Sequence, residues 1–310
     1  MRRCLLALFA ALALGACGAD DDERDRGSAQ PQGGKLRITL GTQDFPEARL
    51  LGELWRQALA VNGYAVDLRK RVGPTEDLDR AVREGEIDGH PAYTGTSLSI
   101  VFGEEVSGLD PERTYDQVEQ LYETRGQALS AMTPYQNVDA IATTNLFAQR
   151  ERLRTISDLR RLDSFTLGAR PEFEDLYLGL EGMQQVYGLT NATFAPVTLG
   201  AQYTALDERD VDAANVFTTD PQLQGGAYTV LEDPERLFGS QNAVMVVDAD
   251  KLERVGADMF MRVVDEVNRR LTTDAIVDMN RAVTDGQDDG EVAARFLREA
   301  GLLRPIGSDD

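Results

Sequence analysis

The sequence predicts an α/β protein whose body is built as two lobes. Short apolar strands alternate with amphipathic helices along most of the chain, a pattern typical of sheets covered by helices. The body from Lys35 to about Ile306, roughly 270 residues, is large enough to divide into two cores. An apolar segment near residue 243 and the helices after it could complete the first lobe around an inserted second lobe. Two consecutive domains are the alternative.

The first part of the body reads as a βαβαβ unit, for which a parallel sheet is expected. Leu36, Ile38 and Leu40 alternate as in a half-buried strand. A helix should follow, with Asp44 as N-cap, Glu47 completing a capping box and Gly63 as left-handed C-cap. The next predicted elements are a strand through Val66, Leu68 and Val72, a helix over Asp77–Glu84 and a strand over Ile87–Tyr93.

The remainder continues the alternation. Helices are predicted over Pro111–Ser130 (capped by Asp110 or Thr114), Leu146–Arg161, Phe173–Tyr187 and Gln202–Glu208. Strands are predicted over Ala140–Thr143, Phe165–Ala169, Ala192–Val197, Val211–Phe217, Tyr228–Leu231 and Ala243–Val247. The segment Lys251–Ala300 reads as three helices. The predicted lobes are residues 35–142 plus 244–310 for lobe 1, and 143–243 for lobe 2.

The N-terminus reads as a secretory signal, residues 1–16. Arg2 and Arg3 precede an apolar run that is too short to span a bilayer. Leu14-Gly15-Ala16-Cys17 resembles the lipobox of bacterial lipoproteins, which implies an acylated Cys17 and an extracytoplasmic chain anchored to the cell membrane. An ordinary secretory signal is the alternative. Residues 17–34 are polar and glycine-rich, as expected of a flexible tether.

Composition excludes several classes of protein. The formal net charge is −21, which disfavours binding to nucleic acid through phosphates. His90 is the single histidine, and cleavage before Cys17 would remove Cys4 and leave one cysteine. Neither a His-dependent catalytic triad nor a Cys/His zinc site can then be assembled. We therefore expect no enzyme, no cofactor and no metal, and His90 is most simply a partly buried polar residue.

The segment Gly85–Thr96 has the form of a ligand site. It brings the ring of Tyr93 and the hydroxyl groups of Thr94 and Thr96 to a strand end, where Gly95 would let the backbone approach a small molecule closely.

Together with Gly41-Thr42-Gln43-Asp44-Phe45-Pro46-Glu47, this segment resembles the substrate-binding proteins of ABC importers for glycine betaine, choline and related quaternary ammonium compounds. Further stretches match that family in order, from Leu36 to Leu302: Ile156-Ser157-Asp158-Leu159, Pro171-Glu172-Phe173, Val216-Phe217-Thr218-Thr219-Asp220 and Leu231-Glu232-Asp233. The resemblance implies a type II periplasmic-binding-protein fold with a hinge. It also implies a receptor, usually monomeric, that passes its ligand to a permease and ATPase.

In this family a box of tyrosines holds the trimethylammonium group by cation–π attraction. Tyr93 and Thr96 match the family's Tyr-Thr-Gly-Thr turn. Gln43 stands where relatives often have lysine, and Leu176 stands where they often have arginine, so both usual cationic partners of a ligand carboxylate are replaced. Asp139, Phe217 and Ser240 fall at or near positions of cage tyrosines.

These replacements shape the expected ligand. Phe217 can still offer a π face, and Asp139 could pair with a cation unless it merely caps a helix. We expect a small organic cation, with choline favoured over glycine betaine. Carnitine, ergothioneine, an uncharged solute, or a sensor role without transport are the alternatives.

Overall fold

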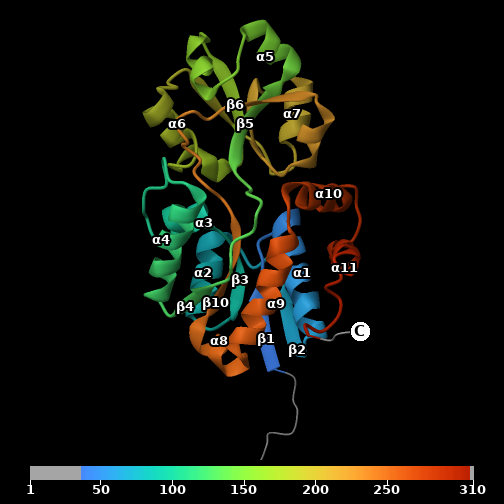
Figure 1. Ribbon diagram of the computed structural model, residues 1–310. Helices are drawn as coiled ribbons and strands as arrows, with labels where there is room; N and C mark the ends of the chain where they lie inside the picture. The colour runs from blue at the N-terminus through green and yellow to red at the C-terminus, as the bar shows by residue number, and fades with distance from the viewer. Residues whose placement is uncertain (1–35, 308–310) are drawn as a thin grey trace, which may run out of the picture. The chain divides into compact units, whose positions relative to one another are not determined.

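The computed structural model describes residues 36–307, in which the strands form two five-stranded sheets (Figure 1). The strands are β1 (Leu36–Gly41), β2 (Tyr64–Arg69), β3 (Gly89–Tyr93), β4 (Gln127–Leu129), β5 (Asp139–Thr144), β6 (Phe165–Ala169), β7 (Ala192–Pro196), β8 (Ala213–Phe217), β9 (Tyr228–Leu231) and β10 (Ala243–Asp248). The α-helices are α1 (Pro46–Val61), α2 (Thr75–Arg83), α3 (Thr94–Thr96), α4 (Pro111–Glu123), α5 (Asn145–Glu151), α6 (Leu180–Tyr187), α7 (Gln202–Glu208), α8 (Ala249–Val255), α9 (Ala257–Arg270), α10 (Thr273–Thr284) and α11 (Asp289–Glu299).

The first sheet has the strand order β2-β1-β3-β10-β4. Strand β1 pairs in parallel with β2 and β3, as the βαβαβ pattern predicted. Strand β10 follows the whole second sheet in the sequence, yet it lies between β3 and β4 and runs antiparallel to both. The first sheet is therefore mixed and is assembled from both ends of the body.

The second sheet has the order β7-β6-β8-β5-β9. Strand β6 is parallel to β7 and β8, whereas β5 is antiparallel to β8 and β9. Strand β5 lies wholly in this sheet and includes residue 142, where the predicted first portion of lobe 1 ends.

The chain passes between the sheets twice, through residues 130–138 and 232–242, which we call the crossing segments. They run side by side for a short distance. The backbone N–H of Asn137 donates to the carbonyl of Gln241 at 2.9 Å, and Gln136 forms an antiparallel bridge with Asn242. The two connections are therefore tied to each other by backbone hydrogen bonds.

Helices α1, α9, α10 and α11 pack with β1 and β10 around the largest core, and Figure 1 shows α1 and α9 side by side at the first sheet. The side chains of Leu50, Leu51, Leu54 and Trp55 from α1 are fully buried there. Trp55 Nε1 donates to Oδ1 of Asn268 on α9 at 2.9 Å. A second core, which includes Phe165, Leu167 and Met183, belongs to the second sheet.

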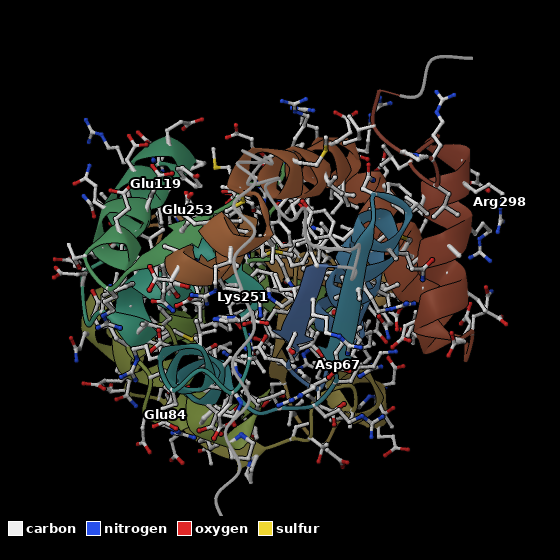
Figure 2. All side chains as sticks on the ribbon, turned by 90° about the horizontal axis from the view of Figure 1, so that it is seen from below. Asp67, Glu84, Glu119, Lys251, Glu253 and Arg298 are labelled. Carbon is white, nitrogen blue, oxygen red and sulfur yellow. The ribbon has the colours of Figure 1, made fainter. Side chains whose placement is uncertain are left out.

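Charged side chains surround the first sheet. Figure 2 labels Asp67 on β2, Glu119 on α4, Glu253 on α8 and Arg298 on α11 among the side chains that project from these elements. Asp67, Glu253 and Arg298 are exposed.

No helix within residues 36–307 is both long and apolar enough to cross a membrane.

Several predicted helices are too long, and backbone breaks explain the difference. The predicted helix Pro111–Ser130 ends at Glu123, because Gly126 adopts a φ of 71° and the chain turns into β4. Arg152, with a φ of 57°, ends α5, and a separate 3-10 helix covers Ile156–Arg161. The predicted helix Phe173–Tyr187 begins only after Gly179.

The C-terminal helices and two early strands also differ from prediction. Four helices, α8 to α11, replace the three expected over Lys251–Ala300, because Gly256 with a φ of 90° divides the first of them. Strand β2 ends at Arg69, before Val72, and β3 begins at Gly89 rather than Ile87. The expected cap Asp110 is confirmed, because its side chain accepts a hydrogen bond from the backbone N–H of Arg113. Gly63 does adopt a left-handed φ of 95°, but it follows the C-cap of α1, which is Asn62.

The predicted capping box of α1 is wrong. The N-cap of α1 is Phe45, and no side chain caps this end. Asp44 instead forms salt bridges with Arg49 and Arg71. Glu47, which was expected to close the box, turns into the protein and is 2% exposed.

Candidate ligand-binding site

The carboxylate of Glu47 lies at the centre of a buried hydrogen-bond cluster. Its Oε1 accepts hydrogen bonds from Tyr93 Oη at 2.8 Å, Tyr135 Oη at 3.1 Å and Asn137 Nδ2 at 3.0 Å. Its Oε2 accepts from Thr219 Oγ1 at 2.7 Å and Asn280 Nδ2 at 3.0 Å. We call these residues the Glu47 cluster: Glu47, Tyr93, Tyr135, Asn137, Thr219 and Asn280.

The Glu47 cluster joins parts of the chain that belong to both sheets. Tyr93 ends β3, and Tyr135 and Asn137 lie in the first crossing segment. Thr219 follows β8 of the second sheet, and Asn280 projects from α10. The carboxyl ends of strands, where β3 and β8 deliver Tyr93 and Thr219, are where open α/β sheets usually bind ligands.

The negative charge of this cluster is dispersed but not cancelled. All five neighbours donate to Glu47, so both its oxygens act as acceptors, as in the ionised form. Burial raises the pKa of Tyr93 and of Tyr135 well above the usual phenol value, and the charge of Glu47 adds to the rise. Both hydroxyl groups therefore remain neutral donors. Among the described residues, no arginine or lysine forms a salt bridge with Glu47.

The turn that holds Tyr93 and Thr96 is docked on the second crossing segment. Thr96 donates from its backbone N–H and from its hydroxyl to Gln241 Oε1, at 2.9 and 3.2 Å. The carbonyl of Ser240 accepts from the N–H of Gly95 at 3.0 Å, and a Cβ at Gly95 would come within 2.6 Å of it. The absence of a side chain at Gly95 thus permits an approach to the protein's own backbone.

A second group, which we call the Arg170 corner, consists of Arg170, Asp139, Asn215, Phe173 and Phe217. Arg170 contacts both Asp139 oxygens, at 2.8 and 3.3 Å, and donates to Asn215 Oδ1 at 2.6 Å. Its guanidinium carbon lies 5.2 Å from the ring centroid of Phe173 and 5.5 Å from that of Phe217. The two site residues predicted to meet a ligand cation, Asp139 and Phe217, therefore meet Arg170.

The local sequence explains how Arg170 reaches this corner. Arg170 directly follows β6, and Pro171 after it restricts its backbone to the extended region, with φ −55° and ψ 145°. Asp139 opens β5 directly opposite Phe217 on β8, and Asn215 lies two residues before Phe217 on the same face. Burial lowers the pKa of Arg170, but the charge and hydrogen bonding of Asp139, together with the charge of Glu172, outweigh that effect and the pKa shift is upward.

The side chains of the other predicted site residues within 36–307 form hydrogen bonds with members of neither group. Gln43 donates from Nε2 to Thr75 Oγ1 at 2.9 Å, and its buried Oε1 has no partner among the described residues. The hydroxyl of Ser240 points to the carbonyl of Leu109, at 3.4 Å. His90 is 1% exposed, so the expectation of partial burial is wrong, and burial lowers its pKa. Cys17 lies outside the described residues.

Sequence reasoning missed most of the Glu47 cluster. Glu47 itself was assigned to a helix cap, and Tyr135, Asn137 and Asn280 carry no local signal that separates them from ordinary polar residues. Arg170 could have been found, because an arginine directly after an apolar strand and before a proline has its position restricted.

Two cavities of about 580 and 350 Å³ are lined by residues outside both groups, including Arg83 and Arg125 in the first and Arg262 and Arg270 in the second.

Comparison with known proteins identifies relatives over most of the body. A family described as the substrate binding domain of ABC-type glycine betaine transport system matches residues 37–299. The glycine-betaine-binding protein of Pseudomonas aeruginosa is 32% identical over 280 residues, which cover 86% of this chain and 88% of that protein. The glycine betaine-binding protein YehZ of Escherichia coli is 23% identical over 281 residues, covering 86% and 92%.

Solved structures share the fold. A glycine betaine/carnitine/choline ABC transporter structure aligns with a TM-score of 0.72 at 21% identity, covering 86% of this chain and 99% of that one. Lactococcal OpuAC, in its closed-liganded conformation complexed with glycine betaine, aligns with a TM-score of 0.61 at 16% identity, covering 86% and 97%. The fold is thus that of type II periplasmic binding proteins, with two mixed sheets and helices.

The match to the family covers nearly all of the described residues, and the relative from Pseudomonas aeruginosa supports it over almost its full length. The chain therefore belongs to the family of substrate-binding domains of ABC-type glycine betaine transport systems.

Proposed function

We propose that the protein is an extracytoplasmic receptor that binds a small quaternary ammonium compound of the choline or betaine kind, leaves it chemically unchanged, and delivers it to a permease and ATPase. Family membership supports the receptor role. Relatives are named for binding glycine betaine and for carnitine transport, and one solved structure of the same fold is a choline binding protein in complex with choline.

The observation that carries the ligand class is the Glu47 cluster. A buried carboxylate surrounded only by neutral donors projects a negative potential that water screens weakly. The Tyr93 hydroxyl donates a hydrogen bond to that carboxylate, which makes the tyrosine ring richer in electrons and a better partner for a cation. A quaternary ammonium group needs no hydrogen bond, so it suits a carboxylate whose lone pairs are already engaged.

The role of Asp139 differs from the expectation. Arg170 cancels its charge at 2.8 Å, so the negative potential for a ligand comes chiefly from Glu47. We accordingly place the ammonium group near Tyr93 and the Glu47 cluster in this proposal.

The test compares two glutamates of one helix. Glu47→Gln removes the uncancelled charge, whereas Glu53→Gln removes a buried carboxylate that Lys70 and Arg56 already neutralise. We expect isothermal titration calorimetry to show choline or glycine betaine binding to the wild-type protein. This binding should weaken at least tenfold, or about 1.4 kcal/mol, in Glu47→Gln and remain near the wild-type value in Glu53→Gln.

Equal losses in both variants would contradict the role of Glu47, and thermal unfolding of each variant controls for damage to the fold. Carnitine and ergothioneine belong in the same titration series, because a relative from Listeria monocytogenes is named for carnitine transport and one from Helicobacter pylori for ergothioneine transport. If only these two bind, the receptor role stands with a different cargo. If none of the four binds, a sensor role becomes the better explanation.

The remaining features of the proposal concern anchoring and movement. We propose cleavage of residues 1–16, lipidation of Cys17, a tether over residues 17–34, and a monomeric body whose two lobes, each built on one of the two sheets, move about the crossing segments. Membrane fractionation tests the anchor: Cys17→Ser should shift the protein out of the membrane fraction, and its retention there would contradict lipidation.

A further inference from the structure

We propose that Arg170 is a selectivity residue, which fills a cation site from within the protein and so disfavours ligands that are purely cationic. The Arg170 corner offers two aromatic faces and a carboxylate. Aromatic faces and carboxylates are the groups to which an organic cation binds best. In this protein the guanidinium group of Arg170 already contacts them.

The contacts of Arg170 match those that a ligand cation would make. The guanidinium lies over Phe173 and Phe217 at 5.2 and 5.5 Å, within the 6 Å range of cation–π attraction. It also makes two contacts to Asp139, the nearer at 2.8 Å. Asp139 therefore has its charge balanced before any ligand arrives.

The corner can be reached from solvent. The side chain of Arg170 is 17% exposed and that of Asp139 is 11% exposed, whereas Phe173 is fully buried and forms the floor. Arg170 Nε forms no hydrogen bond among the described residues and only approaches Glu172 Oε1 at 3.7 Å. The corner lies at the carboxyl ends of β6 and β8, the edge at which a ligand is expected.

The sign of the effect follows from the charges. With Arg170 present, a choline-like cation is repelled by the positive charge at this corner, whereas the carboxylate of a zwitterion such as glycine betaine is attracted to it. Without Arg170, the corner holds the charge of Asp139 and the open faces of two rings. Arg170 therefore favours zwitterions over pure cations. The sequence favoured choline over glycine betaine, because no cationic side chain was expected near the ligand, and Arg170 reverses that order. This inference rests on the proposed binding of quaternary amines.

The experiment measures choline and glycine betaine affinities by calorimetry for wild type, Arg170→Gln, Asp139→Asn and the double variant. We expect Arg170→Gln to bind choline at least tenfold more tightly and to shift the choline-to-betaine preference toward choline. The double variant, which has neither charge, should lose that gain. Asp139→Asn should shift the preference toward glycine betaine, because Arg170 then keeps its charge unbalanced.

Unchanged or weaker choline binding by Arg170→Gln, in a protein that unfolds at a temperature close to that of wild type, would overturn the proposal. Should Arg170→Gln fold poorly, the Asp139→Asn result decides, and a shift toward choline there would overturn it equally. If wild type binds neither ligand but Arg170→Gln binds choline, the proposed function fails while the role of Arg170 stands. If no protein of the set binds either ligand, both fail.

Discussion

Two carboxylates at the candidate site differ in how their charges are balanced. Asp139 is paired with Arg170 at 2.8 Å, whereas Glu47 accepts hydrogen bonds from five neutral groups. The identity of each residue was visible in the sequence, but the partner that decides its electrostatic role was not. Removing Glu47 or Arg170 is therefore expected to have opposite effects on the binding of a pure cation.

A third carboxylate, Asp220, makes stability depend on pH. It accepts hydrogen bonds from Tyr203 Oη at 2.9 Å and from the backbone N–H of Phe217 at 3.0 Å. Burial raises the pKa of Asp220 from 3.8 to about 6, and the charge of Glu47 adds to the rise. Because the folded state holds the proton more tightly than the unfolded state, the folded protein gains stability as pH falls through 6 toward 3.8.

We predict that lowering the pH from 7 to 5 stabilises the wild-type protein relative to Asp220→Asn. The expected change in the difference of unfolding free energies is about 1 kcal/mol, since the full slope applies only between the two pKa values. Urea unfolding of both proteins at pH 7, 6 and 5 measures it. A difference that is flat, or that changes in the other direction, would contradict a raised pKa at Asp220.

At the scale of elements, α1 connects the core with the site. Its N-terminal turn supplies Glu47, while further along the helix Leu50, Leu51, Leu54 and Trp55 are fully buried against neighbouring helices and strands. The helix was predicted from the spacing of its apolar residues. The same residues hold the helix in place, because their side chains are buried in the core. The position of Glu47 therefore depends on how firmly α1 is held.

Trp55→Phe should test this attachment. It removes the hydrogen bond from Trp55 Nε1 to Asn268 Oδ1 and leaves a buried acceptor without its indole partner. We predict a loss of about 1–3 kcal/mol in the free energy of unfolding, with a further contribution from lost packing. Chemical denaturation measures the loss. Met259→Ala, at a side chain that is 38% exposed on α9, is the matched control and should change stability by less than about 0.5 kcal/mol.

The helix boundaries that were wrong share a cause. Periodicity finds an apolar face but does not register a single residue in the left-handed region, such as Gly126, Arg152 or Gly256. Glycine at such a position is visible in the sequence and could have divided two of these helices. Arg152 gives no comparable signal, because only its surroundings select a positive φ.

At the scale of the whole body, two hydrogen bonds join Thr219, which follows β8 of the second sheet, to other members of the Glu47 cluster. Thr219 Oγ1 donates to Glu47 Oε2 at 2.7 Å, and Asn280 Nδ2 approaches the Thr219 carbonyl at 3.2 Å. We infer that this contact helps to hold the two sheets in a closed arrangement about the crossing segments.

Thr219→Val keeps the shape of the side chain and removes the donor. A hydrogen bond to a charged group contributes about 1.5–3 kcal/mol, so ligand affinity should fall by roughly tenfold or more. Small-angle X-ray scattering should also report a larger radius of gyration without ligand. Thr190→Val, at an exposed threonine, is the control. Wild-type affinity and radius in Thr219→Val would show that the contact does not stabilise closure.

Local patterns in the sequence were sufficient for the α/β class, for β6, β9 and α7 at their observed bounds, and for the parallel pairing of β1 with β2 and β3. They were sufficient because periodicity and strand order act over short stretches of chain. The family resemblance was likewise carried by short motifs, and the match over residues 37–299 confirms it.

The partners of Glu47 and Arg170 were decided only by the tertiary structure. Thr219 lies 172 residues from Glu47 in the sequence, and Asn215 lies 45 residues from Arg170. Whether a buried carboxylate attracts a ligand depends on which charges and donors fold against it, and no local pattern contains that information. The sequence by itself thus determined the kind of protein, while long-range packing decided where its negative potential lies.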